Sequence, residues 1–139
     1  MTGLKQTHAL YLEDLSIGQR FSSTDYEITM EEIKAFAGQY DPQIFHLDER
    51  AAEATLFQRL AASGWNTAAI TMRLLVGSLP IAGGLVGAGI EVEWPRPTRP
   101  GDVLHVESEV IEITRSRSKP DRGIARVRRN TRNQRGEIV

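Results

Sequence analysis

An acidic side chain and an imidazole lie close together in residues 40–48, which read YDPQIFHLD. Asp41 and His46 are five residues apart, and Pro42 between them predicts an irregular loop. Histidine has an unperturbed pKa near neutral pH, which suits proton transfer to and from water. Because a nearby carboxylate can bind the same water, the pair is a candidate for general acid–base chemistry.

The spacing alone leaves a second interpretation open. Asp41 can be a turn former before proline and His46 a half-buried loop residue, since many loops hold both types. His8 and His105 are expected to face solvent. The histidines and carboxylates do not have the spacing of a metal site, so no metal is predicted. The chain has no cysteine, which excludes disulfides, thiolate metal sites and a cysteine nucleophile.

The elements on either side of this loop can be read from the sequence. Residues 19–28 predict a polar strand. Thr29 and Glu32 match the T-x-x-E capping box of a helix start. The apolar face of that helix is formed by Ile33, Phe36, Ala37 and Tyr40. Beyond the loop, Asp48 is expected to cap a short helix through residues 50–54.

Residues 64–76 (GWNTAAITMRLLV) predict a third helix, which is apolar on nearly every side. Its best apolar stripe consists of Trp65, Ala68, Ala69 and Met72. A helix that is apolar all round must be surrounded by protein. We therefore expect it to be central and buried.

Strands are predicted after this helix. Val86–Trp94 alternates apolar residues with small or charged ones, which is typical of a half-buried strand. The proline-rich residues 94–102 follow as a rigid connection. Val103–Thr114 predicts a long strand whose apolar parity changes after Val110, which indicates a β-bulge. Gly123–Arg129 predicts another strand.

This order of elements predicts an α+β domain in which a curved antiparallel sheet wraps one long buried helix, which is the hot-dog fold. A length of 139 residues fits a single domain over residues 1–139. The composition, 40% hydrophobic and 25% charged, is typical of globular proteins and excludes disordered and coiled-coil classes. After a turn at 133–136, residues 137–139 read as the beginning of a further strand.

Nothing in the sequence indicates a membrane. The segment Met1–Leu12 has no apolar stretch of the secretory type. The uncharged stretch 74–90 contains Pro80 and five glycines, so it is not expected to span a bilayer. The expected location is the cytoplasm, without a membrane partner.

Three separated motifs carry a family resemblance: the YDPQIFHLD stretch, Ala62-Ser63-Gly64-Trp65, and residues 94–102, which read WPRPTRPGD. They resemble the MaoC-like dehydratases, the (R)-specific enoyl-CoA hydratase branch of the hot-dog superfamily. Members often read D-x-N-P-x-H at the first motif, and one bacterial subgroup reads Y-D-P-Q-x-F-H-x-D. The second and third motifs are similar to the family's A-S-G-W and W-x-R-P-V-R-P-G-D. The resemblance covers about residues 10–139.

The resemblance implies an enzyme of fatty acid metabolism that adds water reversibly, with syn geometry, to a trans-2-enoyl thioester, giving the (R)-3-hydroxyacyl thioester. Asp41 and His46 match the catalytic pair, with His46 as base on water and Asp41 as its orienting and relaying partner, although these roles can be exchanged. The N–H of Gly64, at a helix start, is expected to hold the enolate oxygen. Gly64 can also be a plain packing or capping glycine.

The resemblance also suggests substrate contacts, namely Gln43, Phe45, Ser63, Trp65, Arg96 and Arg99. Gln43 departs from the family, because the asparagine before the proline is absent and its role falls to Gln43 or to no residue. Ser63 is better interpreted as a helix cap than as a nucleophile. Coenzyme A is expected only as part of the substrate, with no separate cofactor.

Nine of the seventeen basic residues lie in the last quarter of the chain: Arg115, Arg117, Lys119, Arg122, Arg126, Arg128, Arg129, Arg132 and Arg135. They can bind the phosphates of coenzyme A or simply form a solvated strand that discourages aggregation. The net charge of −1 and the lack of interleaved aromatic residues argue against nucleic acid.

Two alternatives to the hydratase remain, a hot-dog acyl-CoA thioesterase and a non-catalytic acyl-thioester-binding protein. Thioesterases of this fold usually carry an acidic residue on the central helix, and residues 64–76 have none. We expect at least a homodimer, because one sheet around one helix leaves a strand edge unpaired. The family usually continues with an apolar strand after the GEIV segment, so the final strand is expected to be missing or truncated.

Overall fold

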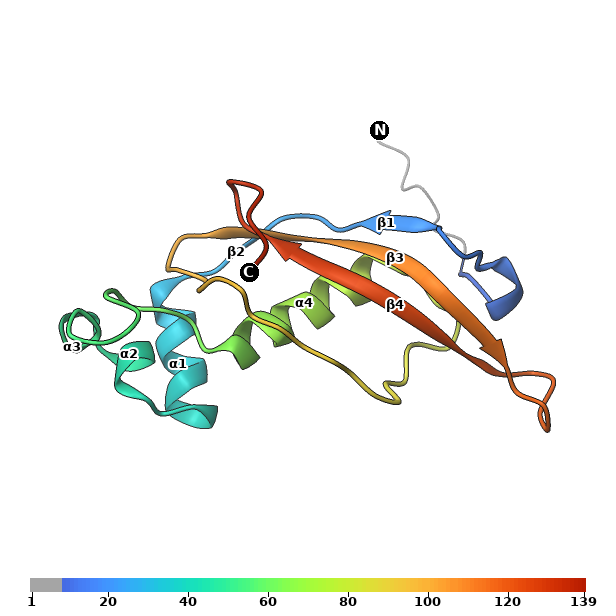
Figure 1. Cartoon of the computed structure of the whole chain (residues 1–139), viewed down its shortest axis with the longest axis horizontal. Helices are drawn as coiled ribbons and strands as arrows, with labels where there is room; N and C mark the ends of the chain where they lie inside the picture. Colours follow the sequence, from blue (N-terminus) through green and yellow to red (C-terminus); the bar gives the residue numbers. More distant parts are fainter. Residues whose placement is uncertain (1–8) are drawn as a thin grey trace, which may run out of the picture.

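The structure is a computed structural model that describes residues 9–139. His8 and most of the segment Met1–Leu12, discussed above, therefore lie outside the described residues. In the described part, antiparallel strands curve along one side of a long helix, α4 (Gly64–Ser78), while shorter helices gather near its N-terminal end (Figure 1). This arrangement is the one that the sequence predicts.

The long strand β3 (Val103–Arg115) is the centre of the sheet. It pairs antiparallel with β4 (Gly123–Arg132) and with the short strands β1 (Arg20–Ser22) and β2 (Tyr26–Glu27). Because β1 and β4 both pair with residues 107–109, they lie on opposite edges of β3. The strand predicted for residues 19–28 thus forms as two short pieces.

A β-bulge bends the sheet where the sequence predicts it. The register between β3 and β4 shifts between Val110 and Glu112. Before the bulge, Leu104, Val106 and Val110 are buried on the face toward the helices. An extra residue increases the local twist, which lets the sheet curve over α4.

Helix α1 (Met30–Tyr40) begins and ends at the predicted signals. The Thr29 side chain accepts the Glu32 N–H at 3.2 Å, which is half of a capping box. The Glu32 carboxylate accepts the Tyr26 hydroxyl at 2.7 Å, so its partner is a side chain in β2. The helix stops at Tyr40, one residue before Asp41-Pro42.

The loop that carries the acid–base pair is not wholly irregular. Residues 44–47 form the one-turn helix α2 (Ile44–Leu47), which contains His46, whereas the sequence predicts a non-helical loop there. Pro42 excludes helix only for the residue before it, so a new turn can begin after Gln43. As predicted, Asp48 then caps the short helix α3 (Glu49–Ala52) by accepting the Ala51 N–H at 2.8 Å.

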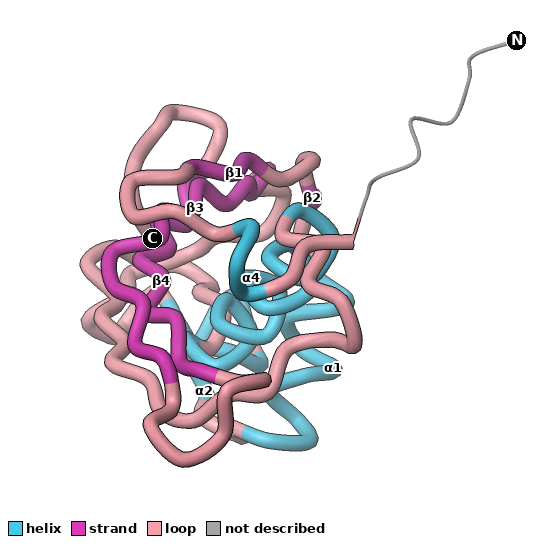
Figure 2. The backbone as a smooth tube through the Cα atoms, turned by 90° about the vertical axis from the view of Figure 1, so that its right-hand side faces the viewer, coloured by secondary structure: helices cyan, strands magenta, loops and turns pink. Residues whose placement is uncertain are grey.

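The prediction that the central helix is buried on every side is wrong. One face of α4 is buried through Asn66, Thr67, Ile70, Leu74 and Leu75. The other face is open to solvent, with Trp65 58% and Val76 53% exposed. The strands lie on one side of the helices only, so one chain cannot cover the second apolar face of α4 (Figure 2).

The strand predicted for Val86–Trp94 is also absent from the described residues. This segment is extended and largely exposed, with Val86 96% and Ile90 62% accessible. A strand needs a neighbour that accepts and donates its main-chain hydrogen bonds. Within residues 9–139, no backbone hydrogen bond joins residues 86–94 to another strand.

The hydrophobic core and the C-terminal residues hold the sheet and the helices together around the site. The core lies between the sheet, α1 and α4, and consists of Ile28, Ile33, Leu60, Ala62, Ile70, Leu74, Leu104, Val106 and Val139. The predicted turn at 133–136 is present, and Ile138 makes an isolated bridge to Arg132. No helix in residues 9–139 is long and apolar enough to cross a membrane.

Candidate active site

The structure brings Asp41 and His46 into contact. Asp41 is the C-cap residue of α1, and His46 lies on α2, so the turn at Pro42 folds the two side chains toward each other. The His46 Nε2 lies 3.2 Å from the Asp41 Oδ2. Their side chains are only 5% and 18% exposed, respectively. The pair is therefore a nearly buried acid–base unit.

A main-chain carbonyl fixes the orientation of His46. The Nδ1 lies 2.6 Å from the oxygen of Ala61, and because a carbonyl can only accept, the Nδ1 must donate. Proton exchange is thereby left to the Nε2, which faces Asp41. The rings of Phe45 and Phe57 lie 4.6 and 6.0 Å from the imidazole, centroid to centroid, and hold it in an aromatic pocket.

Hydrogen bonds keep Asp41 ionised. Its Oδ1 accepts the Gln43 Nε2 at 2.6 Å, and its Oδ2 accepts the Ser63 hydroxyl at 2.7 Å. Burial by itself raises the pKa of Asp41, but the hydrogen bonds from Gln43 and Ser63 and the charge of His46 outweigh it. The net effect is a pKa below the usual value of a carboxyl group. Asp41 is thus a carboxylate that can orient water or an imidazolium.

Ser63 and Gln43 both act on Asp41 in this structure. The Ser63 hydroxyl also accepts the Trp65 N–H at 3.3 Å, which agrees with the predicted helix cap. One side chain therefore starts α4 and holds the carboxylate. Gln43 supplies the second donor.

Gly64 begins α4 directly beneath the indole of Trp94. A Cβ at position 64 would lie 2.6 Å from two atoms of that ring, so only glycine fits there without movement. The Gly64 N–H is the first of the helix, and no residue in the range 9–139 accepts it. Trp94 also packs edge-on against Trp65, with ring centroids 5.1 Å apart. A free N–H at a helix start, close to Ser63 and Asp41, can receive a negatively charged oxygen.

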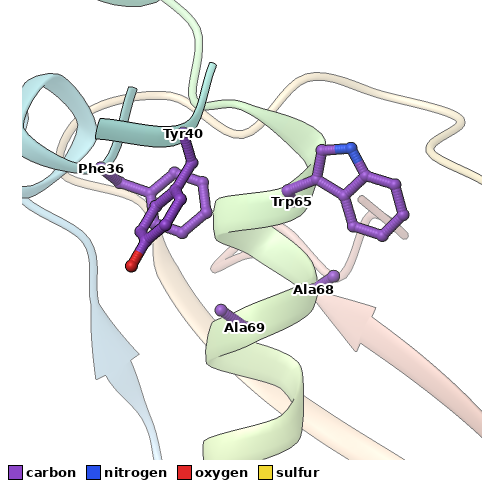
Figure 3. Close-up of a pocket in the computed structure, with 5 residues that line it drawn as sticks. All are labelled: Phe36, Tyr40, Trp65, Ala68 and Ala69. Atoms are coloured by element: carbon purple, nitrogen blue, oxygen red, sulfur yellow. The ribbon is translucent and has the colours of Figure 1, made fainter. Parts of the chain in front are cut away.

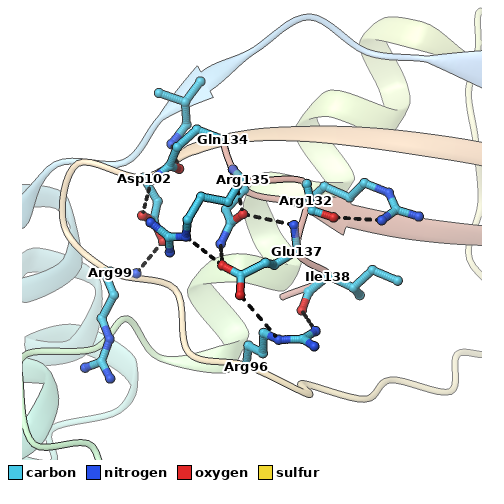
Figure 4. A network of polar contacts seen from close by, with 11 residues as sticks. Arg96, Arg99, Asp102, Arg132, Gln134, Arg135, Glu137 and Ile138 are labelled. Atoms are coloured by element: carbon cyan, nitrogen blue, oxygen red, sulfur yellow. Dashed lines mark hydrogen bonds and ion pairs between the residues drawn. The ribbon is translucent and has the colours of Figure 1, made fainter.

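The two arginines of the proline-rich turn have internal partners. Arg99 donates to the carbonyls of Phe57 and Arg59 at 2.9 Å and to that of Leu60 at 3.4 Å. Arg96 donates to the carbonyl of Ile138 and lies 3.7 Å from Glu137 (Figure 4). Arg99 therefore supports the segment that leads into Ala61, while Arg96 is the more exposed of the two.

The tip of the β3–β4 hairpin is remote from the pair in one chain. The hairpin turn lies at one end of the long axis, and α1, α2 and α3 lie at the other (Figure 1). Along β3 and β4, arginines face acidic side chains across the sheet, as in the pairs Arg132–Glu107 and Arg126–Glu112. These pairs agree with the solvated-strand interpretation of the basic residues.

A groove of about 470 Å³ runs between α1 and α4 beside the pair. Phe36 and Tyr40 form one wall, Trp65 the other, and Ala68 and Ala69 the floor (Figure 3). Three members of the predicted apolar stripe of α4, namely Trp65, Ala68 and Ala69, therefore line an open groove rather than the core. Its volume lies in the range of small-molecule sites.

Sequence reasoning missed three parts of this site. The Ala61 carbonyl, the ring of Phe57 and the indole of Trp94 reach His46 and Gly64 from positions 11 or more residues away. A main-chain carbonyl has no residue-type signal, because every residue has one. Of the three, only Trp94 could be suspected from the sequence, since it opens the third motif.

Three comparisons with known proteins bear on this geometry. The family described as MaoC like domain matches residues 14–133. The uncharacterized protein YdeM of Bacillus subtilis (strain 168) is 32% identical over 126 residues, which is 88% of this chain and 87% of that protein.

Solved structures show the same fold. The MaoC-like dehydratase from Rhodospirillum rubrum is 60% identical with a TM-score of 0.92, covering 94% of this chain and 90% of that chain. The (R)-hydratase from A. caviae involved in PHA biosynthesis is 28% identical with a TM-score of 0.73, covering 91% of both chains. The predicted hot-dog fold is confirmed.

Proposed function

Since this chain belongs to the MaoC-like domain family, as its motifs predicted, we propose that it hydrates trans-2-enoyl thioesters reversibly to (R)-3-hydroxyacyl thioesters. The observation that carries the proposal is the buried contact of His46 with Asp41, in which the Nδ1 is committed to Ala61 and the Nε2 is left for proton exchange. The (R) configuration is taken from the (R)-hydratase that resembles this chain.

In the proposed reaction, one water adds across the double bond. The His46 Nε2 takes a proton from the water, while the Asp41 carboxylate orients it. The oxygen of the water bonds to the β-carbon, and the π electrons move to the thioester oxygen as an enolate. The proton then passes from the imidazolium to the α-carbon. Because oxygen and proton both come from the side of the pair, addition is syn.

The enolate oxygen is assigned to the N-terminal end of α4. The unpaired N–H of Gly64 donates to it, and the partial positive charge of a 15-residue helix favours the anion. Coenzyme A takes part only as the carrier of the acyl group, and the reaction requires no metal or further cofactor.

The alternative reactions predict different products. Thioesterases of this fold usually carry an acidic residue on the central helix, and α4 has none between Gly64 and Ser78. A binding protein would leave the thioester unchanged. The site therefore favours hydration over hydrolysis.

A panel of enoyl-CoA thioesters of different chain length tests the proposal. We expect loss of the conjugated-enoyl absorbance without release of free thiol. Equal rates of thiol release and absorbance loss would establish a thioesterase instead. No change in either signal, with thioester binding retained, would establish the binding protein.

The phosphates of coenzyme A are assigned to exposed arginines near the entrance of the site. Within one chain, Arg96 is the better candidate for a phosphate contact, because Arg99 already donates hydrogen bonds to three main-chain carbonyls. The basic residues at the tip of the β3–β4 hairpin, within 115–122, lie at the opposite end of the long axis from α1 and α2, so they would have to come from a second copy (Figure 1). Such charge-assisted contacts weaken with salt.

We further propose that the protein is a homodimer. Residues 86–94 are extended, alternate apolar side chains, and lack strand partners within residues 9–139. The exposed face of α4 is apolar as well, with Trp65, Met72 and Val76 on the surface. Exposed apolar side chains in such numbers are typical of protein interfaces.

Light scattering at micromolar concentration should give twice the mass of one chain. Ile90→Glu places a charge in the proposed interface and should shift the mass toward one chain. Ile124→Glu, at an equally exposed isoleucine on β4, is the matched control and should leave it unchanged. A monomeric mass with full activity would contradict the dimer.

A further inference from the structure

Two rows of side chains face each other along the groove beside the active site. On α1 the row is Glu32, Phe36 and Tyr40, and on α4 it is Trp65, Ala69 and Arg73. Each row follows the i, i+4 spacing that aligns residues on one helix face. The groove is lined by Phe36 and Tyr40 of the first row and by Trp65 and Ala69 of the second (Figure 3).

The two helices run in opposite directions, so the ends of the groove differ. At one end, Ser63 at the start of α4 bonds Asp41 at the end of α1. At the other end, the Arg73 guanidinium lies 5.7 Å from the centroid of the Tyr26 ring, and the Tyr26 hydroxyl bonds Glu32 at the start of α1. The apolar groove therefore leads from the acid–base pair toward a polar cluster.

Arg73 is the solvent-exposed cation of this cluster. It forms no ion pair and donates no hydrogen bond to any residue of the range 9–139, and its contact there is with the face of Tyr26. Glu32 is already engaged, since its carboxylate accepts the Tyr26 hydroxyl at 2.7 Å. A guanidinium presents five donors in a planar fork that matches a carboxylate.

The spacing along α4 suits an acyl chain of moderate length. Arg73 lies nine positions after Gly64, which is about 13–14 Å of helix rise. The small residues Ala68 and Ala69 leave room for the chain between the aromatic walls.

From this juxtaposition we infer that the groove binds acyl groups that end in a carboxylate, with Arg73 as the residue that selects it. The substrate class is then the thioester of an unsaturated dicarboxylic acid. The chain lies over Ala68 and Ala69, and its distal carboxylate is bound by the Arg73 fork. This inference rests on the proposed function only for the reaction, since binding of the acyl group can be measured without it.

Calorimetry with two matched pairs of saturated thioesters tests the inference: suberoyl-CoA against octanoyl-CoA, and adipoyl-CoA against hexanoyl-CoA. Within each pair, only the distal group differs. We expect the dicarboxylic member of at least one pair to bind about tenfold more tightly, as a charge-assisted contact of an exposed arginine allows. Arg73→Met should remove this preference and leave the affinity for octanoyl-CoA unchanged.

Arg128→Met, which removes an exposed arginine on β4 that has no ion-pair partner within residues 9–139, is the control and should retain the preference. Equal affinities within both pairs, or a preference that survives Arg73→Met, would overturn the inference whether or not hydration occurs. A carboxylate preference that depends on Arg73 in a protein without hydratase activity would support this inference and overturn the proposed reaction.

Discussion

Replacing Asp41 by Asn should lower the hydration rate about 10²–10⁴-fold, the usual cost of losing a positioned acid or base. Asparagine keeps the size of the side chain but removes the charge that orients water and the imidazolium. The pKa of Asp41 lies below its usual range, so the wild type carries this charge throughout the neutral pH range. The measurement is the hydration rate together with the melting temperature.

His46→Gln should cause a comparable loss and is a better test than His46→Ala. The imidazole is buried against Phe45 and Phe57, so alanine would leave a cavity and lower stability. Glutamine fills more of that space and can still donate to the Ala61 carbonyl, but it cannot accept a proton at neutral pH. The double variant should be little slower than either single variant, because residues that act as a unit are not additive.

Folded single variants that keep near-wild-type rates would show that the pair is structural. Glu53→Gln, a neutralised and exposed carboxylate just after α3, is a control that should change neither rate nor melting temperature.

Gly64→Ala should lower activity about a hundredfold while the protein stays folded, since misplacement by about 1 Å near a reacting group can cost that much. The added Cβ would lie 2.6 Å from the Trp94 ring, so the indole or the helix start must move. Either movement displaces the N–H assigned to the enolate oxygen. Stability should change little, because alanine favours helix and Trp94 is partly exposed.

A double-mutant cycle tests whether the steric clash between a Cβ at position 64 and the Trp94 ring causes the loss of activity. In a Trp94→Ala background, the Cβ at position 64 has space, so Gly64→Ala should cost much less than in the wild type. An equal cost in both backgrounds would show that the ring is not responsible. Wild-type activity of Gly64→Ala itself would remove Gly64 from the proposed mechanism.

Local signals predicted the elements well. Thr29, Asp48 and Ser63 cap helices as their residue types indicate, and the parity change after Val110 marks a real bulge. These features depend on residues within a few positions of one another, which is the range over which capping and side-chain alternation act.

Predictions about burial failed where they needed knowledge of neighbours. The alternation in Val86–Trp94 is real, but a strand forms only beside a partner, and none is present within residues 9–139. The apolar residues of α4 are likewise real, but one sheet covers only one face. Periodicity states which residues share a face, not what lies against it.

The acid–base residues of the candidate site could be predicted from the sequence, but the main-chain groups that hold the site in place could not. Asp41 and His46 stand out by type and spacing, and their family resemblance strengthens the interpretation. The contact of His46 with the Ala61 carbonyl spans 15 residues and leaves no trace in the sequence. The same holds for the three carbonyls that Arg99 binds.

The hydrogen bond from His46 to the Ala61 carbonyl has a consequence for how this site can drift over evolutionary time. The tautomer of the base depends on a main-chain atom, so any residue that fits the fully buried position 61 can provide it. Selection on catalysis therefore acts there on the path of the backbone and on side-chain volume rather than on chemical identity. Position 61 can change among small residues in related enzymes while the Nδ1 of the imidazole keeps its proton and the Nε2 stays free to exchange one.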